Sequence, residues 1–516
     1  MKERFTATGV EPIGTTPEQF ATIVRDEFVK WGKLVKDTGA KVEYMSIKTN
    51  GYDSEADIVV IGGGLAGYTA AIEAAQQGAQ VLLLEKQPET GGSSVLSGGF
   101  FAFSGTEIQK AAGISDSDEL LFDDIRRAGQ QQNDDALVRT YVDHQMAAYE
   151  WVVRHGGKFT SVELAAGHSA PRAHSLRPQD FMQMLTQHAH DTGRVKTLLN
   201  ARAERLLRAH DGARVDGVSA NINGKPQSIR ARRSVVLAAG GFSRNEEMLK
   251  LFVPHQAKGV RYGGYGNTGD GVRMAWALGA GLRDVAHIKG TFGFHPDAAT
   301  VPGRDWTKLA VYRGAIAVNK QARRFVDESK SYKLLGDAVL AQPDARAYQV
   351  FDQGIMDTAS DTAPPFKFKE ALALGRLLTE PTLEAIARRV GLDSATLTAT
   401  VEQYNGFVRN GRDEEFGRSG LSSGYGKLVE LKRGPWYAYP STSGLIATYC
   451  GVTVDTETRV LDVFGAPIPG LFAAGEMTGG FHGVAYMTGS ALGKCVIFGR
   501  IAGRNAAAFG NNQGEI

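Results

Sequence analysis

The sequence predicts an α/β fold in which an inserted α+β domain interrupts a domain built on parallel strands. From Asp57 onward, short apolar runs typical of buried strands alternate with segments that have helical periodicity. A glycine-rich turn at 62–67 joins the first such run to the first helical segment. The strand and helix pattern returns at the end of the chain, after a middle region richer in charge, helix formers and proline. We therefore expect the first and last parts to form one domain, which the middle part caps.

The individual elements follow from these patterns. The expected strands are Ala56–Ile61, Gln80–Leu84, 213–221, 234–238 and Gly470–Ala474, and the expected helices are Leu65–Gln77 and 490–507. The predicted domain parts are 45–288 and 431–516 for the split domain and 289–430 for the capping, catalytic domain, with 1–44 as a helical extension.

Composition excludes several classes of function. The 58 Lys and Arg and 56 Asp and Glu are mixed along 516 residues, for a net charge of +2. Nucleic acid and anionic membranes are therefore not expected partners. The two cysteines, Cys450 and Cys495, imply neither a disulfide framework nor a Cys-based metal site, so we predict a cytoplasmic protein without a metal. No apolar stretch of about 18 residues predicts a membrane span, and the N-terminus lacks the apolar core of a secretory signal.

Residues 1–44 differ from the rest of the chain. Thr16-Pro17-Glu18 is a helix N-cap signature, and an apolar stripe follows it at helical spacing, formed by Phe20, Val24, Phe28, Trp31 and Val35. The stretches GVEPIGTTPEQF and KWGKLVKDTGAK resemble the C-terminal end of the substrate-binding proteins of tripartite tricarboxylate transporters, over about 40 residues. The segment is then a fusion remnant, or the enzyme begins at Met45. An ordinary N-terminal helical arm is the alternative.

The turn at 62–67 carries a nucleotide-binding fingerprint. Gly62, Gly64 and Gly67 form a G-x-G-x-x-G between a predicted strand and a predicted helix, and Glu85 ends the next strand 18 residues later. In this context Gly62 makes the turn, Gly64 admits a pyrophosphate to the backbone, and Gly67 lets helix and strand pack closely. The diphosphate meets the helix N-terminus, and Glu85 accepts hydrogen bonds from the ribose.

Further glycine motifs carry a resemblance to a known superfamily. They are Gly91–Ser94, Ser97–Gly99, Thr268–Gly271, Gly470–Glu476 and Gly489–Arg500. With the fingerprint, they resemble the flavoprotein superfamily of fumarate reductases and 3-ketosteroid dehydrogenases across nearly all of 55–508. The resemblance implies a Rossmann-like FAD-binding domain. Members with covalent FAD carry a His in the first of these segments, and 88–105 contains none, so we expect non-covalent FAD.

The same resemblance implies the residues that hold FAD. Ser93, Ser97 and Gly98 are expected along the flavin, Asp270 and Glu476 at the ribityl or diphosphate part, and the helix starting near Ser490 at the pyrimidine end. The full predicted set is Gly62, Gly64, Leu65, Ala66, Gly67, Glu85, Lys86, Gly92, Ser93, Ser94, Ser97, Gly98, Gly99, Ala203, Ala239, Gly240, Asp270, Glu476, Ser490, Ala491 and Leu492. Only one fingerprint is present, so a second nucleotide site for NAD(P)H is not expected. Electrons are therefore expected to pass to an external acceptor, a quinone or a carrier protein.

The residues that would clamp a dicarboxylate in fumarate reductases are mostly replaced. In fumarate reductases one arginine of the clamp, which is also the proton donor, follows a run like the one that begins here at Arg324-Phe325, and Tyr332 stands in its place. The second arginine follows a run like His482-Gly483, and Tyr486 stands in its place. Fumarate reductases also use two histidines in this clamp, and of these only one like His295 is kept. A fumarate or succinate enzyme is therefore not expected.

Both tyrosines resemble the ketosteroid dehydrogenase branch. The resemblance implies that Tyr486, with Thr488 and Gly489, faces a substrate ketone, which Tyr486 and a backbone N–H polarise. Tyr332 is then expected to remove the α-proton, provided that a neighbour lowers its pKa. His295 is a candidate substrate contact, and Tyr449 and His482 lie near the flavin by motif position. Packing tyrosines with no chemical role are the alternative.

These expectations combine into a dehydrogenase that introduces a C=C bond α,β to the carbonyl of a cyclic ketone, a 3-ketosteroid or a smaller alicyclic ketone. The alternative within enzymes is a reductase of an activated C=C bond, such as an enoate. A non-catalytic flavoprotein sensor is the third possibility.

Overall fold

A computed structural model describes residues 51–510 except 211, 213, 298–306 and 423–424, together with Thr16, Gln19, Thr22, Ile23, Asp26 and Lys30. The chain divides into two units between Gly51 and Tyr52. In the first unit, Gln19 Oε1 accepts from the Thr16 N–H (2.9 Å) and Thr16 Oγ1 accepts from the Gln19 N–H (3.3 Å). This reciprocal pair is a capping box and confirms the helix start predicted at Thr16. The other predictions for 1–44 lie outside the described residues.

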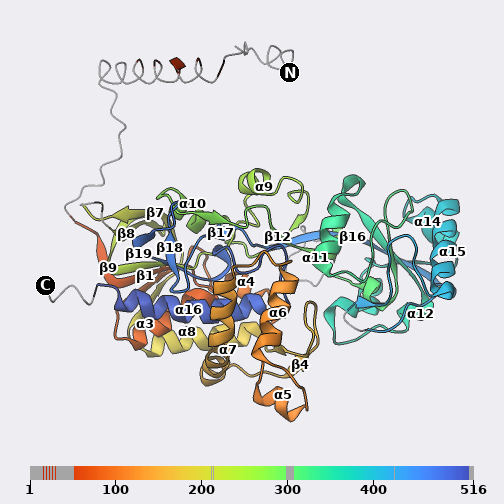
Figure 1. Cartoon of the computed structure of the whole chain (residues 1–516), viewed down its shortest axis with the longest axis horizontal. Coiled ribbons are helices and arrows are strands. Elements are labelled where there is room, and N and C mark those ends of the chain that lie inside the picture. The colour runs from red at the N-terminus through yellow and green to blue at the C-terminus, as the bar shows by residue number, and fades with distance from the viewer. Residues whose placement is uncertain are drawn as a thin grey trace. The chain divides into compact units, whose positions relative to one another are not determined.

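The larger unit is built on a mostly parallel sheet (Figure 1). Its strand order is β18-β19-β9-β1-β2-β6, with bounds β18 Arg459–Leu461, β19 Pro467–Ala473, β9 Lys225–Leu237, β1 Ser54–Ile61, β2 Val81–Leu84 and β6 Val195–Leu198. All neighbours are parallel except β18 and β19. β7 (Ala201–Arg208) and β8 (Val215–Ile222) add an antiparallel meander to the first half of β9. The predicted strands all fall on members of this sheet.

Helices from both ends of the chain cover one face of this sheet. In Figure 1, α3 (Leu65–Gln76), α8 (Pro178–Asp191), α7 (Asp135–Arg154) and α16 (Ser490–Ala508) lie together on one side of the strands. α16 packs directly on α3, because a Cβ on Gly499 or Gly503 would lie 2.8 Å from the carbonyl oxygen of Ala66 or 2.3 Å from that of Ala70. α16 therefore completes the helical layer begun by α3, as predicted for a split domain.

A second sheet is organised around one long strand, β16 (Trp436–Thr448). Its first half pairs with β14 (Ala347–Asp352) and β15 (Leu378–Glu380), and its second half with β12 (Ile288–Phe294) and β10 (Val260–Arg261). β13 (Ile316–Val318) extends the sheet beyond β14. Helices α11 (Tyr332–Leu340), α12 (Gln353–Met356), α13 (Phe368–Ala373), α14 (Leu383–Arg389) and α15 (Ser394–Asn410) belong to this part.

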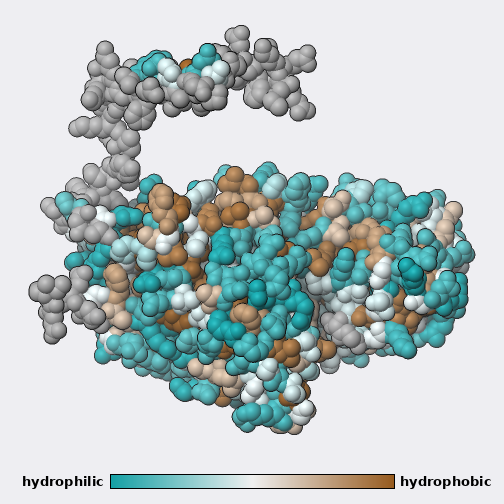
Figure 2. Space-filling model, in the orientation of Figure 1, coloured by the Kyte–Doolittle hydropathy of each residue, from teal (hydrophilic) through white to brown (hydrophobic). Residues whose placement is uncertain are grey.

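The remaining elements are short or peripheral. They are α4 (Gly92–Val95), β3 (Phe100–Ala102), α5 (Glu107–Ala111), α6 (Asp118–Ala128), β4 (Ser161–Glu163), β5 (Ala173–Ser175), α9 (Glu246–Phe252), α10 (Asp270–Trp276), β11 (Leu282–Arg283) and β17 (Gly451–Val452). No helix of the described chain is long and apolar enough to cross a bilayer. On the face drawn in Figure 2, apolar side chains lie interspersed among hydrophilic ones.

The buried apolar side chains form two large clusters. One contains residues between Ala56 and Ile288 and between Leu445 and Ala507, and the other contains residues between Phe292 and Tyr439. β16 runs from the second cluster into the first. The α/β class, with a Rossmann-like domain that a second domain interrupts, is confirmed. The domain boundaries placed at 288 and 430 stay a prediction, although Ile288 belongs to the first cluster and Phe292 to the second.

Candidate active site

A cavity of about 360 Å³ lies where the carboxyl ends of β1 and β2 meet the first turns of α3 and α16. This is the edge of an open parallel sheet at which ligands bind. Of the predicted cofactor residues, all line the cavity except Gly67, Gly99 and Ser490. Of the predicted substrate-side residues, Tyr486 and Gly489 line it, whereas Tyr332, Thr488 and His295 do not.

The glycine turn before α3 is shaped by close backbone contacts. Gly62 has φ +112°, and a Cβ there would lie 2.3 Å from the carbonyl oxygen of Ala238. A Cβ on Gly67 would lie 1.9 Å from the carbonyl oxygen of Gly62. Gly67 thus serves helix packing rather than the cavity, as the fingerprint predicts. Gly99 has a similar role, since a Cβ there would lie 1.9 Å from the oxygen of Leu176.

Glu85 is fixed in place at the end of β2. Its Oε2 accepts from the N–H of Gly63 at 2.8 Å, and its Oε1 accepts from the N–H of Gln87 at 2.8 Å. The residue is 8% exposed and lines the cavity. Each carboxylate oxygen has more than one acceptor site, so both retain capacity to accept ribose hydroxyls.

Asp270, at the start of α10, is held by two cations. Lys86 Nζ lies 2.8 Å from Asp270 Oδ2, and Arg202 lies 3.1 Å from Oδ1. Burial would raise the pKa of Asp270, but Lys86 and Arg202 outweigh it and lower that pKa. Asp270 and Lys86 therefore face the cavity as an ion pair.

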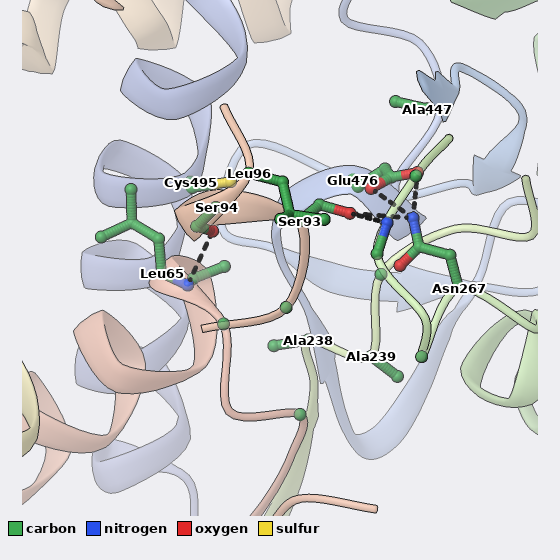
Figure 3. A pocket seen from close by; sticks show the side chains of 18 of the residues that line it. Leu65, Ser93, Ser94, Leu96, Ala238, Ala239, Asn267, Ala447, Glu476 and Cys495 are labelled. Carbon is green, nitrogen blue, oxygen red and sulfur yellow. Dashed lines mark hydrogen bonds between the residues drawn. The ribbon is translucent and has the colours of Figure 1, made fainter. Parts of the chain in front are cut away.

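Asn267 ties together two of the predicted cofactor residues (Figure 3). Its Nδ2 lies 3.0 Å from both carboxylate oxygens of Glu476 and 3.1 Å from Ser93 Oγ. Burial raises the pKa of Glu476, although the N–H of Thr448 and the Asn267 amide counteract it. Asn267 was not predicted. The glycine-rich run 263–271 around it was the available signal, of which only its last part, Thr268–Gly271, was used.

α16 begins beside the cavity without a side-chain cap. Its N-cap residue Gly489 has φ +88°, and a Cβ there would lie 2.8 Å from the backbone of Phe101 and of Ala102. Ala491 and Leu492 line the cavity, whereas Ser490 Oγ donates to the Met487 carbonyl at 2.7 Å. The positive end of the helix dipole therefore faces the cavity, as predicted from the sequence.

The two predicted tyrosines come together at this helix start. The N–H of Gly489 donates to Tyr486 Oη at 3.3 Å, and Tyr332 Oη lies 3.2 Å from Thr488 Oγ1. Burial raises the pKa of Tyr332 well above its usual value, and the neighbouring Tyr486 adds to the rise. Burial also acts on Tyr486, but Lys289 and the Gly489 N–H outweigh it and lower that pKa. The pKa-lowering neighbour that the sequence hypothesis required for Tyr332 therefore acts on Tyr486 instead.

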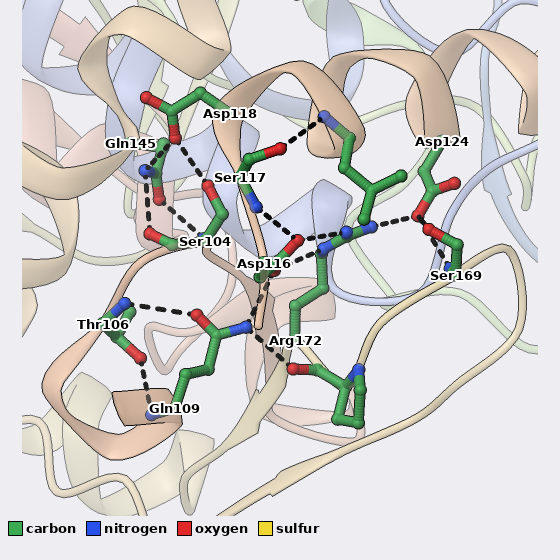
Figure 4. Close-up of polar contacts among 12 residues, drawn as sticks. Ser104, Thr106, Gln109, Asp116, Ser117, Asp118, Asp124, Gln145, Ser169 and Arg172 are labelled. Carbon is green, nitrogen blue, oxygen red and sulfur yellow. Dashed lines mark hydrogen bonds and ion pairs between the residues drawn. The ribbon is translucent and has the colours of Figure 1, made fainter. Parts of the chain in front are cut away.

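A buried polar network supports the segment that carries Thr488. His168 Nε2 donates to the Thr488 carbonyl at 2.6 Å, and burial lowers the pKa of His168 to about 4, so the ring is neutral at pH 7. The next residue, Ser169, donates from its N–H and its hydroxyl to Asp124 at 2.7 Å. Arg172, fully buried, binds Asp116 on one side and Asp124 on the other (Figure 4).

Other histidines and tyrosines divide between the cavity and the second sheet. His482 and Tyr449 line the cavity with ring centroids 5.1 Å apart. Burial lowers the pKa of His482 well below its usual value. His295 follows β12, and its ring centroid lies 5.6 Å from that of Tyr439 in the second sheet. Its assignment to the substrate stays a prediction.

Comparison with known proteins decides the family. The model of a family described as an FAD binding domain matches residues 57–492. The chain belongs to this FAD-binding family. It is 33% identical over 484 residues to "Fumarate reductase (cytochrome)" of Shewanella frigidimarina, covering 92% of this chain and 81% of that one.

Two solved structures support the same fold. An open flavocytochrome c3 fumarate reductase matches with a TM-score of 0.76 and 32% identity, covering 89% of this chain and 79% of that one. A 3-ketosteroid-Δ4-(5α)-dehydrogenase from Rhodococcus jostii RHA1 matches with a TM-score of 0.72 and 29% identity, covering 90% and 99%. The predicted superfamily is confirmed. The similarities do not favour the ketosteroid branch, because sequence identity to the fumarate reductases is slightly higher.

FAD is the cofactor of this family, and the cavity fits it. The uncapped start of α3 and the glycine turn suit a diphosphate, and Glu85 suits the adenosine ribose. The start of α16 suits the pyrimidine end of the flavin, where reduction develops negative charge. The chain is thus an FAD-dependent oxidoreductase. Sequence reasoning missed Lys289 and Lys494, which also line the cavity; Lys494 Nζ donates to the Thr478 carbonyl at 2.6 Å.

Proposed function

We propose that the chain is a dehydrogenase that introduces a C=C bond α,β to the carbonyl of a ketone, with cyclic ketones as the substrate class. One observation carries the proposal: Tyr486 lines the cavity and its Oη accepts from the Gly489 N–H, while the hydroxyls of a second tyrosine and a threonine lie close to the same turn. Neutral donors of this kind suit a ketone oxygen, whereas the arginine positions of a dicarboxylate clamp are occupied by the tyrosines.

The reaction needs one proton acceptor and one hydride acceptor. Bound FAD supplies the hydride acceptor. The α-proton leaves to a tyrosine oxygen, and the electron pair of that C–H bond becomes the new C=C bond. The β-hydrogen leaves with its own electron pair. Hydrogen bonds from a hydroxyl and a backbone N–H stabilise the enolate oxygen that forms during proton removal. Reoxidation passes two electrons to an external acceptor, which we propose is a quinone or a carrier protein.

The contacts that hold Thr488 also fix the positions of the two tyrosines. His168 holds the Thr488 carbonyl, and the loop of His168 is held in turn by Asp124. Because the Thr488 hydroxyl meets Tyr332 and the next residue's N–H meets Tyr486, both tyrosines depend on the position of the same turn.

A reductase of an activated C=C bond is the second candidate, and the 33% identity to a fumarate reductase favours it. The same residues serve this direction, since the tyrosine that accepts the α-proton in oxidation donates it in reduction. The two candidates differ in the substrate that exchanges electrons with the flavin.

An anaerobic flavin assay tests the proposal. The oxidised holoenzyme is mixed with cyclic ketones, steroid and alicyclic, and with succinate, while the flavin absorbance is followed. The reduced holoenzyme is mixed with the corresponding enones, with enoates and with fumarate. We expect bleaching by a cyclic ketone and none by succinate. Reoxidation by enoates or fumarate without any response to ketones or enones would contradict the ketone proposal and favour the second candidate.

A further inference from the structure

Lys289 places a positive charge beside Tyr486, one of the two candidate proton-transfer residues. Its side chain is half-buried and lines the cavity. Within the described part of the chain, no carboxylate lies within ion-pair distance of it, whereas Lys86 and Lys333 are both paired. Its Nζ instead lies 3.7 Å from the ring centroid of Tyr486. Such a cation is attracted to the face of an aromatic ring.

The backbone places Lys289 there through an irregularity in strand pairing. Along β12 and β16, Lys289 is opposite Ala447 but Gly290 is opposite Leu445, so that Ile446 is an extra residue on β16. This β-bulge bends the pair next to the cavity, and bulges of this kind re-aim side chains beside active sites. The extra residue Ile446 and its neighbour Ala447 also line the cavity.

We propose that Lys289 is a positioning residue that acts through Tyr486: its ammonium, held over the Tyr486 ring by the bulge, favours the phenolate, so that Tyr486 rather than Tyr332 exchanges the α-proton. The inference rests on the proposed function in one respect, namely that a tyrosine oxygen exchanges this proton. It also assigns the remaining hydroxyls. Tyr332, whose hydroxyl lies 3.2 Å from that of Thr488, stays protonated, which reverses the roles expected for the two tyrosines from the sequence.

The other ionisable groups around Tyr486 do not supply a competing positive charge. Tyr332 faces it from α11, Tyr141 from α7, and Tyr449 and His482 from the loops after β16 and β19. Burial raises the pKa of each of these three tyrosines and lowers that of His482. All four are therefore neutral at pH 7. Lys494, which also lines the cavity, donates to the Thr478 carbonyl and acts on His482, whereas Lys289 is the lysine that lies over the Tyr486 ring. The lowered pKa of Tyr486 agrees with this geometry.

The test measures the titration of Tyr486 directly in the holoenzyme. Protein labelled with ¹³C at tyrosine Cζ reports phenol ionisation by NMR, and Tyr486→Phe identifies the Tyr486 signal. In Lys289→Met, which keeps the chain length but removes the charge, we expect the Tyr486 titration to move up by about 1–3 pH units, as for a lost opposite charge. Lys289→Arg should restore most of the shift. Lys250→Met, on the exposed face of α9, is the control for loss of a lysine elsewhere.

Kinetics give a second readout on any substrate that turns over. The acid limb of the pH profile for flavin reduction should move up in Lys289→Met by the same amount, with KM for a neutral ketone nearly unchanged. An unmoved Tyr486 titration would overturn the proposal. This holds also if Lys289→Met raises KM for an anionic substrate while the titration stays where it was. The NMR titration needs no substrate, so it decides the role of Lys289 even if the proposed ketone reaction fails.

Discussion

Replacement of Glu85 by Ala tests the cofactor site most directly. The carboxylate accepts two backbone N–H groups at 2.8 Å and faces the cavity at the end of β2. A hydrogen bond contributes about 1 kcal/mol, and up to about 3 kcal/mol when one partner is charged. Loss of the bonds to the ribose should therefore weaken FAD binding by about 1–3 kcal/mol, which is roughly 5- to 150-fold in Kd.

Flavin fluorescence during titration of deflavinated protein with FAD gives the Kd, and thermal unfolding of the same apoprotein gives its stability. Glu85→Gln is the matched control, because it keeps the length and one acceptor oxygen and should give an intermediate Kd. An apoprotein of normal stability with an unchanged Kd in both variants would refute the assignment of Glu85 to the cofactor.

The remaining predictions concern cofactor attachment, the tyrosines and the buried ion pairs. Acid precipitation should release intact FAD into the supernatant, since the expected attachment is non-covalent; flavin retained in the pellet would contradict this. Tyr486→Phe should slow flavin reduction about 10²–10⁴-fold as a lost proton acceptor, and Tyr332→Phe about 10²–10³-fold as a lost donor, with FAD bound in both. Near-normal rates would exclude both roles. Arg172→Met leaves Asp116 and Asp124 without their buried partner, which should lower the free energy of unfolding in urea by about 3–5 kcal/mol. Burial would raise the pKa of Asp124, but Ser169 and Arg172 lower it below the usual value. Its contribution to stability is therefore present above about pH 4 and is lost as the pH falls through the folded-state pKa. Arg172→Met should flatten that loss.

The residues around the glycine turn could be predicted from local sequence patterns. The turn at Gly62 and the acceptor at Glu85 could be predicted because strand, turn and helix follow one another within 32 residues, 54–85. Tyr332 and Tyr486 were found by their motifs. The lowered pKa of Tyr486 could not be predicted, because it depends on a lysine 197 positions earlier in the chain.

Lys289 and Asn267 could not be predicted from the sequence for the same physical reason. Lys289 reaches the cavity through a bulge between β12 and β16, strands that are far apart in sequence, and a bulge leaves no signature in hydrophobic alternation. Asn267 directly precedes the motif Thr268–Gly271, of which only Asp270 was predicted as a cofactor residue. Its partner Glu476 is 209 residues away, so the pairing is visible only once the chain has folded.

The packing of α16 on α3 has a consequence for biosynthesis. The close contacts of Gly499 and Gly503 with the backbone of α3 can form only after α16 has been synthesised, long after α3 itself. A nascent chain on the ribosome holds its glycine turn and first strands while the helix that must cover them is still unsynthesised. Domains fold as units during translation, and pairings between distant segments form late. A premature stop codon even near residue 490 would thus leave the apolar face of α3 exposed, and such a product is a substrate for aggregation and proteolysis rather than a weakened enzyme.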